Sequence, residues 1–410
     1  MSENLNGALS GIRILDLTHV LSGPYCTQIF GDLGAEVIKI ESPAKDHARN
    51  IPPYFVGGDS VYYLAVNRNK RSLVIDLKQQ EGRDLLRRLA LASDVVIENF
   101  RPGVMDRLGL SATALRQQKP ALIWCSITGF GQDGPYRDKA AFDMIVQALS
   151  GGMSLTGESG GPAVRAGIPV GDLAAGMYAA IAILAALQRR HSSGRGDVVD
   201  ISMLDCQAAM LGYQAAYFMQ SGIVPGRQGR AHDSIASYGA FATADAREIV
   251  VAAWTEKMWA DLCRVLGRSD LLSDERFSDN GARRKHREAL WAVLEAEIAR
   301  HELRRLLEMF DRAGIPAAPV NAVDQAVADP QLHARGMVLD LAAADGRHVK
   351  VMGNPIRFSE SVAPEHRYPP APGEDNSEIL QKVLGFSDVE IAALRQRRVV
   401  LDALLGEAAT

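Results

Sequence analysis

The first half of the chain alternates short apolar runs with stretches in which apolar residues recur at helical spacing. The short runs predict strands at Ile12–Leu17, Glu36–Ile40, Ser72–Leu77, Asp94–Ile97 and Ala121–Ile127. The stretches between them predict helices at Tyr25–Leu33 and Glu81–Leu91. Because strands and helices alternate, we expect an α/β fold with a parallel, doubly wound sheet. In such a sheet, ligands bind beyond the carboxyl ends of the strands.

A second feature of the pattern is the long apolar run Leu173–Leu187, which is bounded by Asp172 and by Gln188–Arg190. The run has 15 residues, whereas a membrane span needs ~20 apolar residues, so we predict a helix at the centre of the core. The preceding residues, Ala166–Val170, include proline and β-branched residues and are expected to be extended. Asp172 therefore stands where a buried helix begins. It is either a helix cap or a working carboxylate that the helix dipole keeps ionised, and the local sequence leaves both open.

The pattern changes near Gly222. Pro225–Arg230 is a polar connector, Tyr238–Ala253 predicts a hairpin or meander with a turn at Asp245–Arg247, and charged helices follow. We therefore predict a large Rossmann-like domain and a smaller α+β domain. The large domain spans 1–205 and is completed by 335–410, the small domain spans 225–330, and 206–224 and 331–334 are connectors.

Composition narrows the class of protein. A chain of 410 residues with 47% apolar and 23% charged residues is typical of a soluble globular protein of two domains. The net charge of −4 favours neither nucleic acid nor a membrane as partner. The cysteines form no C-x-x-C pair and the N-terminus lacks a signal peptide, so we expect a cytoplasmic protein. The histidines are dispersed and no H-E-x-x-H is present, so no metal site is expected.

Two apparent motifs carry little weight. Gly157–Gly161 matches G-x-S-x-G, but that nucleophile elbow needs a helix directly after the serine, and here Pro162 follows. The turn His19–Pro24 after the first predicted strand lacks G-x-G-x-x-G, which disfavours a dinucleotide-dependent dehydrogenase. The helix after this turn could still receive another phosphorylated ligand.

Basic residues gather in the loops after predicted strands. Asn67–Arg71, Glu98–Gly103, Arg107 and Lys139 supply cations and one aromatic ring. This combination suits a phosphorylated ligand that contains adenine, with charge for phosphate and a ring for stacking. The alternative is that surface loops carry lysine and arginine in any protein.

Taken together, the chain resembles the class III CoA-transferase family, also called the CaiB/BaiF type, which includes formyl-CoA transferase and succinate–hydroxymethylglutarate CoA-transferase. The matching segments are LDLTHVLSGPYCTQIFGDLGAEVIKIE, NRNKRSLVIDL, ENFRPGVMDRLG, GFGQDGPY, GIPVGDLAAGMYAAIAILAAL, SGRGDVVDISMLD, GRQGRAHDSIASYGAF and GIPAAPVN. They extend over nearly the whole chain in the right order.

The resemblance implies that Asp172 is the nucleophile, which would attack an acyl-CoA thioester and pass through an aspartyl–acyl anhydride and an aspartyl–CoA thioester. Asp143 matches an acidic position that could assist. Glycine-containing loops near Gly23 and Gly226–Gly229 could stabilise the oxyanions. No cofactor is implied beyond coenzyme A as substrate. The CoA site maps onto Val20, Leu21, Asn67, Arg68, Asn69, Lys70, Asn99, Phe100, Arg101, Arg107, Lys139 and Phe142.

The chain departs from formyl-CoA transferase at Leu21, where that enzyme has glutamine, and in a much reduced glycine-rich loop. The stretch GRAHDSIASYGAF is more similar to the succinate–hydroxymethylglutarate enzyme. We therefore expect a donor such as succinyl-CoA and a dicarboxylate acceptor, with Arg165 and His232 as candidates to bind its far carboxylate. Relatives in the family form interlocked homodimers, and the same is expected here.

Two other functions stay open. An α-methylacyl-CoA racemase needs an acid/base pair, and racemases carry a histidine where this chain has Phe142, which cannot carry a proton. A CoA-binding protein without turnover would keep Arg107 and Lys139 but would not need Asp172.

Overall fold

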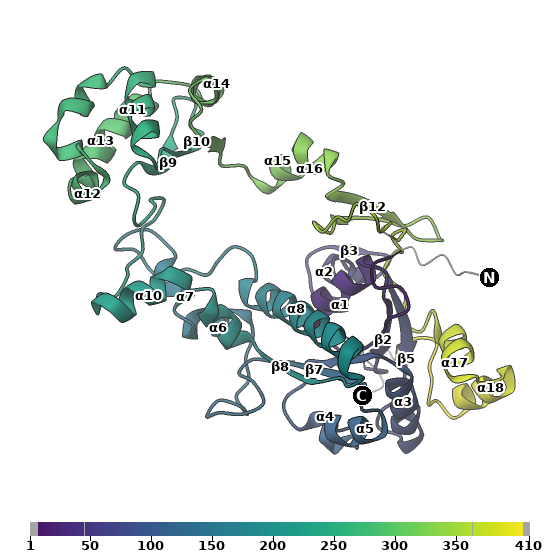
Figure 1. The fold of residues 1–410 in the computed structure, drawn as a ribbon. Helices are drawn as coiled ribbons and strands as arrows, with labels where there is room; N and C mark the ends of the chain where they lie inside the picture. The colour runs from purple at the N-terminus through teal and green to yellow at the C-terminus, as the bar shows by residue number, and fades with distance from the viewer. Residues whose placement is uncertain (1–6, 45, 363, 405–410) are drawn as a thin grey trace. The chain divides into compact units, whose positions relative to one another are not determined.

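The computed structural model describes residues 7–44, 46–362 and 364–404 (Figure 1). The chain forms two compact units, which are described separately. The first unit comprises the chain up to residue 152, residues 165–220 and the chain from residue 334. The second comprises 153–164 and 221–333. Residues 153–164 thus belong with the second unit, whereas the sequence analysis placed them in the large domain.

A six-stranded parallel sheet lies at the centre of the first unit, in the order β5-β2-β1-β6-β7-β8. The strands are β1 (Arg13–Asp16), β2 (Glu36–Glu41), β5 (Lys70–Val74), β6 (Val95–Glu98), β7 (Ile123–Thr128) and β8 (Val198–Ser202). The predicted parallel α/β sheet is therefore confirmed. Strand β8, which was not predicted, lies at the edge of the sheet and pairs with β7 alone among the described strands. From β1 the chain adds β2 and β5 on one side and then β6, β7 and β8 on the other. The crevice between β1 and β6 is therefore the topological switch point, where ligands are expected.

Helices cover both faces of this sheet. One face carries α3 (Gln80–Ala92), α4 (Val104–Arg107), α5 (Ala112–Gln118), α17 (Asn376–Leu384) and α18 (Asp388–Gln396) over a shared apolar core. The other face carries α1 (Ser22–Asp32), α6 (Asp143–Leu149), α8 (Val170–Ser193) and α9 (Met203–Ala209). The C-terminal helices join the first face because the Asp375 carboxylate accepts the backbone N–H of Ser72 and Val400 bridges to Ile75.

Helix α8 contains the long apolar run. By length and composition it could cross a membrane, but Ala174, Ala175 and Ala179 on one face are buried in the core of the unit. Gly176 lets it approach α1 closely, since a Cβ there would lie 2.6 Å from the Ser22 carbonyl oxygen. The opposite face exposes apolar side chains such as Ile181, so only part of the expected burial is present within one chain.

The start of α8 differs from the expectation. The helix begins at Val170, and residues 166–169 form no strand. The residue that precedes the helix is Pro169, so Asp172 is the third residue of the first turn and is not the cap. Extended chain was predicted because proline and β-branched residues disfavour helix, but Pro169 is instead well placed just before a helix start.

Smaller elements complete the first unit. Hairpin β12 (Val338–Ala342) and β13 (His348–Met352) share a small core with α2 (Val61–Leu64) and the 3-10 helix η1 (His47–Asn50). The remaining elements there are hairpin β3 (Phe55–Val56) and β4 (Asp59–Ser60), and α10 (Gly212–Ser221). Short helices α7 (Gly152–Leu155) and α16 (Pro330–Ala334) lie where the chain passes between units.

The second unit has its own core. Its antiparallel sheet, in the order β11-β10-β9, consists of β9 (Tyr238–Ala242), β10 (Glu248–Ala252) and β11 (Ala317–Pro319). The predicted hairpin with its turn at Asp245–Arg247 is present as β9 and β10. The helical part comprises α11 (Glu256–Val265), η2 (Ser269–Ser273), η3 (Glu275–Phe277), α12 (Asn280–Lys285), α13 (Arg287–Ile298), α14 (Leu303–Arg312) and α15 (Val323–Val327).

Candidate active site

A cavity of about 460 Å³ lies at the carboxyl ends of β1, β2, β6 and β7, at the switch point of the sheet. The loops after these strands supply most of its walls. Asp172 from the first turn of α8 and Met203 from the start of α9 also line it. Asp172 therefore faces an open space of ligand size, together with polar groups from several strand ends.

The environment of Asp172 disfavours its charge. Burial, reinforced by the negative charge of Asp143, raises the pKa of the Asp172 carboxyl to about 7. Among the residues that the structure describes, none donates a hydrogen bond to this carboxylate. A carboxylate that has no protein donor and is poorly solvated is more reactive as a nucleophile than one held in a cap.

Asp143 is the first residue of α6, and both of its carboxylate oxygens accept hydrogen bonds from the protein. Oδ1 accepts the backbone N–H of Gly171 at 2.8 Å, and Oδ2 accepts the side-chain amide of Gln147 at 2.7 Å. Asp143 therefore holds the residue next to Asp172 in place. It also acts on Asp172 through its charge, because like charges favour the protonated form of the neighbour.

Tyr62 of α2 is a further group at this place, and the sequence analysis did not single it out. Burial, together with the charges of Asp172 and Asp143, raises the pKa of its hydroxyl to about 12. The phenol is therefore a proton-bearing donor at neutral pH within electrostatic reach of Asp172.

The loop after β1 is held by side-chain contacts to its backbone. The side-chain amide of Asn99 makes two hydrogen bonds of 2.8 Å to the backbone of His19. Its Oδ1 accepts the His19 N–H, and its Nδ2 donates to the His19 carbonyl oxygen. Lys39 Nζ donates to the Thr18 carbonyl oxygen at 2.8 Å. These contacts hold Val20 in the left-handed region, with φ of 67°, which costs a β-branched residue roughly 1–2 kcal/mol. Such strain persists where surrounding contacts over-determine the backbone, and here it shapes the cavity wall.

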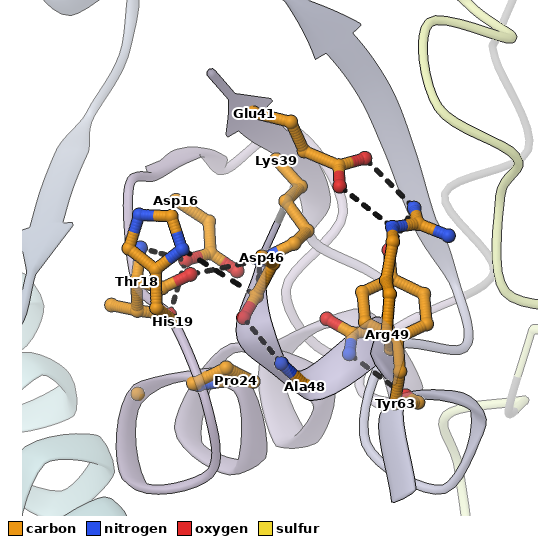
Figure 2. Close-up of polar contacts among 12 residues, drawn as sticks. Asp16, Thr18, His19, Pro24, Lys39, Glu41, Asp46, Ala48, Arg49 and Tyr63 are labelled. Carbon is orange, nitrogen blue, oxygen red and sulfur yellow. Dashed lines mark hydrogen bonds and ion pairs between the residues drawn. The ribbon is translucent and has the colours of Figure 1, made fainter. Parts of the chain in front are cut away.

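A buried ionic network lies under this loop (Figure 2). Asp46 Oδ2 lies 3.4 Å from Lys39 Nζ and 3.5 Å from His19 Nδ1. Burial alone would raise the pKa of Asp46, but Lys39 and His19 outweigh it and lower the pKa well below its usual value. Both His19 and Asp46 also line the cavity, so the network joins Lys39 of β2 to the cavity wall.

A second part of this network surrounds Asp16 at the end of β1. Asp16 accepts from Thr18, Thr27 and Lys70, and these partners with Lys39 outweigh burial and lower its pKa to about 2. Nearby, Arg49 binds Glu41 with two hydrogen bonds of 2.8 Å. The paired charges fix the strand ends on which the cavity is built.

The structure brings about half of the predicted CoA-binding residues to the cavity. Those that line it are Val20, Asn99, Phe100, Arg101, Lys139 and Phe142. Lys139 Nζ lies 3.7 Å from the ring centre of Tyr136. Asn99 faces the cavity, but its amide is occupied by the His19 backbone.

The loop 67–70 does not reach this cavity. Asn67, Arg68 and Lys70 are at most 2% exposed. Arg68 binds both carboxylate oxygens of Asp32, and Asn69 donates to the same carboxylate. These side chains already have protein partners within the unit, and their role in binding CoA stays a prediction. The sequence pattern does not show whether a cation in such a loop binds a ligand or forms a buried ion pair with the protein.

Three other predicted residues of the first unit, Leu21, Arg107 and Arg165, do not line the cavity. Leu21 is buried, and Arg107 is exposed at the end of α4. Arg165 is exposed and donates to the carbonyl oxygens of its neighbours Ala166 and Gly167. His232 belongs to the second unit, where it stacks on Tyr238 at 5.1 Å.

The fold and the cavity define an α/β protein with a carboxylate of raised pKa at the switch point of a parallel sheet. The chain matches the model described as CoA-transferase family III over residues 9–376. The chain therefore belongs to CoA-transferase family III and is a CoA-transferase.

Three relatives illustrate the similarity. The chain is 40% identical over 387 residues to the succinate–glutarate CoA-transferase of Agrobacterium fabrum, covering 93% of this chain and 96% of that one. It is 37% identical to the succinyl-CoA:glutarate CoA-transferase of Homo sapiens, covering 96% and 90%. A crystal structure of a CaiB/BaiF family protein from Brucella suis superposes with a TM-score of 0.83 at 38% identity, covering 92% and 100%.

Proposed function

We propose that the protein moves CoA from a succinyl-CoA-like donor to a dicarboxylic acid, with Asp172 as the nucleophile. The observation that carries the proposal is the Asp172 carboxylate, which lines the cavity and has no hydrogen-bond donor among the described residues. Its pKa, raised to about 7, leaves a substantial ionised fraction at neutral pH. That form is less solvated and more nucleophilic than an exposed aspartate.

The reaction proceeds by paired exchanges at carbonyl carbons. An oxygen of Asp172 attacks the thioester carbonyl, and CoA thiolate leaves to give an aspartyl–acyl anhydride. The thiolate attacks the aspartyl carbonyl, releases the donor acid and forms an aspartyl–CoA thioester. The acceptor carboxylate then attacks this thioester, which releases CoA thiolate and gives a new aspartyl–acyl anhydride. The thiolate attacks the acceptor's carbonyl carbon in this anhydride, which forms the new acyl-CoA and releases the Asp172 carboxylate. Each step breaks one bond to a carbonyl carbon and forms another, so no metal or further cofactor is required.

The tetrahedral intermediates need donors for their oxyanions. The first N–H groups of α1 are suitable, because α1 has no side-chain cap and Ser22 in its first turn lines the cavity. Helix α8 approaches α1 closely at Gly176, one turn from Asp172. The Tyr62 hydroxyl is a second candidate donor. The loop Gly226–Gly229 belongs to the second unit and stays a prediction.

Coenzyme A is long enough to extend beyond the cavity. A neighbouring cavity of about 860 Å³ shares Ser42 and Ala44 with the active one. Its lining includes four cations, Lys78, Arg83, Arg397 and Arg398. We assign the phosphorylated nucleotide end of CoA to this cavity and the thiol end to Asp172, with Arg101 and Lys139 beside the path between them.

The acceptor is inferred from the relatives. Those from Agrobacterium fabrum and Homo sapiens are named for succinate or succinyl-CoA and glutarate. We propose succinyl-CoA as donor and glutarate, or a dicarboxylate of similar length, as acceptor. Arg137 lines the cavity and is a candidate for the far carboxylate. Arg165 and His232 remain predictions for that role.

We also propose that the protein works as a homodimer in the cytoplasm. Exposed apolar side chains gather on α6 and α8, which are in contact, and Ile145 and Ile181 are 48% and 62% exposed. A face of this kind favours a second copy of the chain as its partner. The four cysteines are free, which suits a reducing compartment.

The test of the proposed function is incubation with succinyl-CoA and a panel of carboxylates, with new acyl-CoA read by mass. We expect glutaryl-CoA to form faster than the CoA esters of monocarboxylates. No exchange with any acid, together with racemisation of a 2-methylacyl-CoA, would favour the racemase. Binding of CoA without either reaction would favour a protein without turnover.

A further inference from the structure

Gln147 lies on α6 one turn after Asp143, and both ends of its buried side-chain amide are used. The residue is 3% exposed. Nε2 donates to Asp143 Oδ2 at 2.7 Å, and Oε1 accepts the backbone N–H of Ala166 at 2.9 Å. Because the Ala166 N–H requires an acceptor, the amide orientation is fixed and its NH₂ group faces Asp143.

These bonds hold the segment that leads into Asp172 at two points. Gln147 holds it at Ala166, and Asp143 Oδ1 holds it at Gly171 with a bond of 2.8 Å. The contact at Gly171 is close, since a Cβ there would lie 2.7 Å from Val146 Cγ2 and 3.0 Å from Asp143 Oδ1. Both anchors come from one helix and are joined by the Gln147–Asp143 bond.

We propose that Gln147 is a positioning residue of the CoA transfer, because its amide couples Asp143 to the segment that carries the nucleophile. The inference rests on the proposed function. Gln147 does not line the cavity and acts only through its two partners. It keeps the Asp143 carboxylate turned toward Gly171 and fixes the backbone before Asp172. An amide suits this place because it offers one acceptor and one donor without adding charge.

The charged surroundings make the choice of amide specific. Among the described residues, Asp172 on α8 and Tyr62 on α2 both feel the charge of Asp143. Helix α9 also packs against α6, and its Gln207 accepts a hydrogen bond from Ser150. A carboxylate at position 147 would place a further negative charge in this group and would lack the proton that Asp143 accepts.

The first test is Gln147→Met, which keeps the volume and removes both hydrogen bonds. We expect the single-turnover rate of thioester formation on Asp172 to fall roughly 10- to 100-fold, with KM for the acyl-CoA within about twofold. The matched control is Gln80→Met, since Gln80 makes the same kind of bond to Asp84, four residues on, at an exposed position of α3. That variant should keep the wild-type rate.

The second test is Gln147→Glu measured across pH. A protonated carboxyl can donate to Asp143 as the amide does, whereas an ionised one cannot. The ratio of wild-type to Gln147→Glu rate should therefore grow with pH, and the ratio for Gln147→Met should stay constant. Because an ionised, buried glutamate would also destabilise the fold, the rates are compared at pH values where urea unfolding shows both variants folded.

A wild-type rate in Gln147→Met, or a ratio for Gln147→Glu that does not change with pH, would overturn the inference. If circular dichroism shows that Gln147→Met does not fold, Gln147→Asn, which withdraws the amide by one methylene, carries the same expected loss. Failure of the wild-type protein to form any thioester would instead overturn the proposed function.

Discussion

The Asp143 carboxylate accepts the backbone N–H of Gly171, the residue directly before Asp172, at 2.8 Å. One acidic side chain therefore both positions the nucleophile and opposes its ionisation. Without the hydrogen bond the start of α8 would lose an anchor, and without the charge the pKa of Asp172 would be lower. This relationship accounts for the presence of two carboxylates at a site whose chemistry needs only one nucleophile.

The pH dependence of the first half-reaction follows from this pair. Because Asp172 attacks in its ionised form and its pKa is raised to about 7, thioester formation should increase through neutral pH and level off above it. Asp143→Asn removes the like charge, so its midpoint should lie at lower pH. Single-turnover rates between pH 5 and 9 measure both midpoints, and an unchanged midpoint in Asp143→Asn would contradict the electrostatic role.

Asp172 should reduce the stability of the folded protein at neutral pH. Its pKa is higher in the folded than in the unfolded state, so the folded state binds the proton more tightly, and stability falls as pH rises from about 4 to about 7. Asp172→Asn removes this cost and should be more stable above pH 7, on the order of 1–3 kcal/mol. The difference should vanish below pH 4. Urea unfolding at several pH values measures it, and equal stability at pH 8 would be evidence against burial of the charge.

Asn99 should matter through the backbone that it holds. Asn99→Ala leaves the N–H and carbonyl oxygen of His19 without their partner, which costs about 1–3 kcal/mol and releases the strained Val20. We expect KM for the acyl-CoA to rise about tenfold. Asn280→Ala is the control, because Asn280 brackets backbone groups of Ala236 and Ser234 in the second unit. It should lose similar stability and keep its KM, and a parallel change in both variants would argue against a specific role.

The assignment of the nucleotide end of CoA can be tested with a truncated donor. Lys78→Ala removes a cation from the second cavity and should raise KM for succinyl-CoA about tenfold. KM for succinyl-pantetheine, which lacks the nucleotide, should not change. Lys350→Ala, at an exposed position of β13, serves as the control for loss of one surface charge. Equal effects on both donors would place the nucleotide elsewhere.

Much of the fold could be predicted from the sequence, and the family resemblance supports the proposal that Asp172 is the nucleophile. Strand and helix patterns predict the parallel sheet because buried strands are nearly continuous apolar runs. They miss β8, whose residues alternate as an edge strand does. The family resemblance identifies Asp172 and Asp143 as site residues, and the structure brings both to one place.

The rest of the site could not be predicted because it depends on partners distant in sequence. Arg68 and Lys70 are cations in a strand-end loop, and only the fold shows that Asp32 and Asp16 neutralise them. The side chain of Asn99 is hydrogen-bonded to the backbone of His19, 80 residues away in the sequence. Tyr62 and Gln147 carry no local motif, and they become visible only once α2, α6 and α8 are placed together.

The central claim is that CoA becomes attached to Asp172, and mass spectrometry of the protein after mixing with succinyl-CoA tests it most directly. We predict an adduct of CoA on the peptide that contains Asp172, which hydroxylamine cleaves and glutarate discharges as glutaryl-CoA. Asp172→Asn should form no adduct and should lose at least roughly a thousandfold in exchange rate. Exchange that persists in Asp172→Asn, or that proceeds in the wild-type protein without any adduct, would contradict the account.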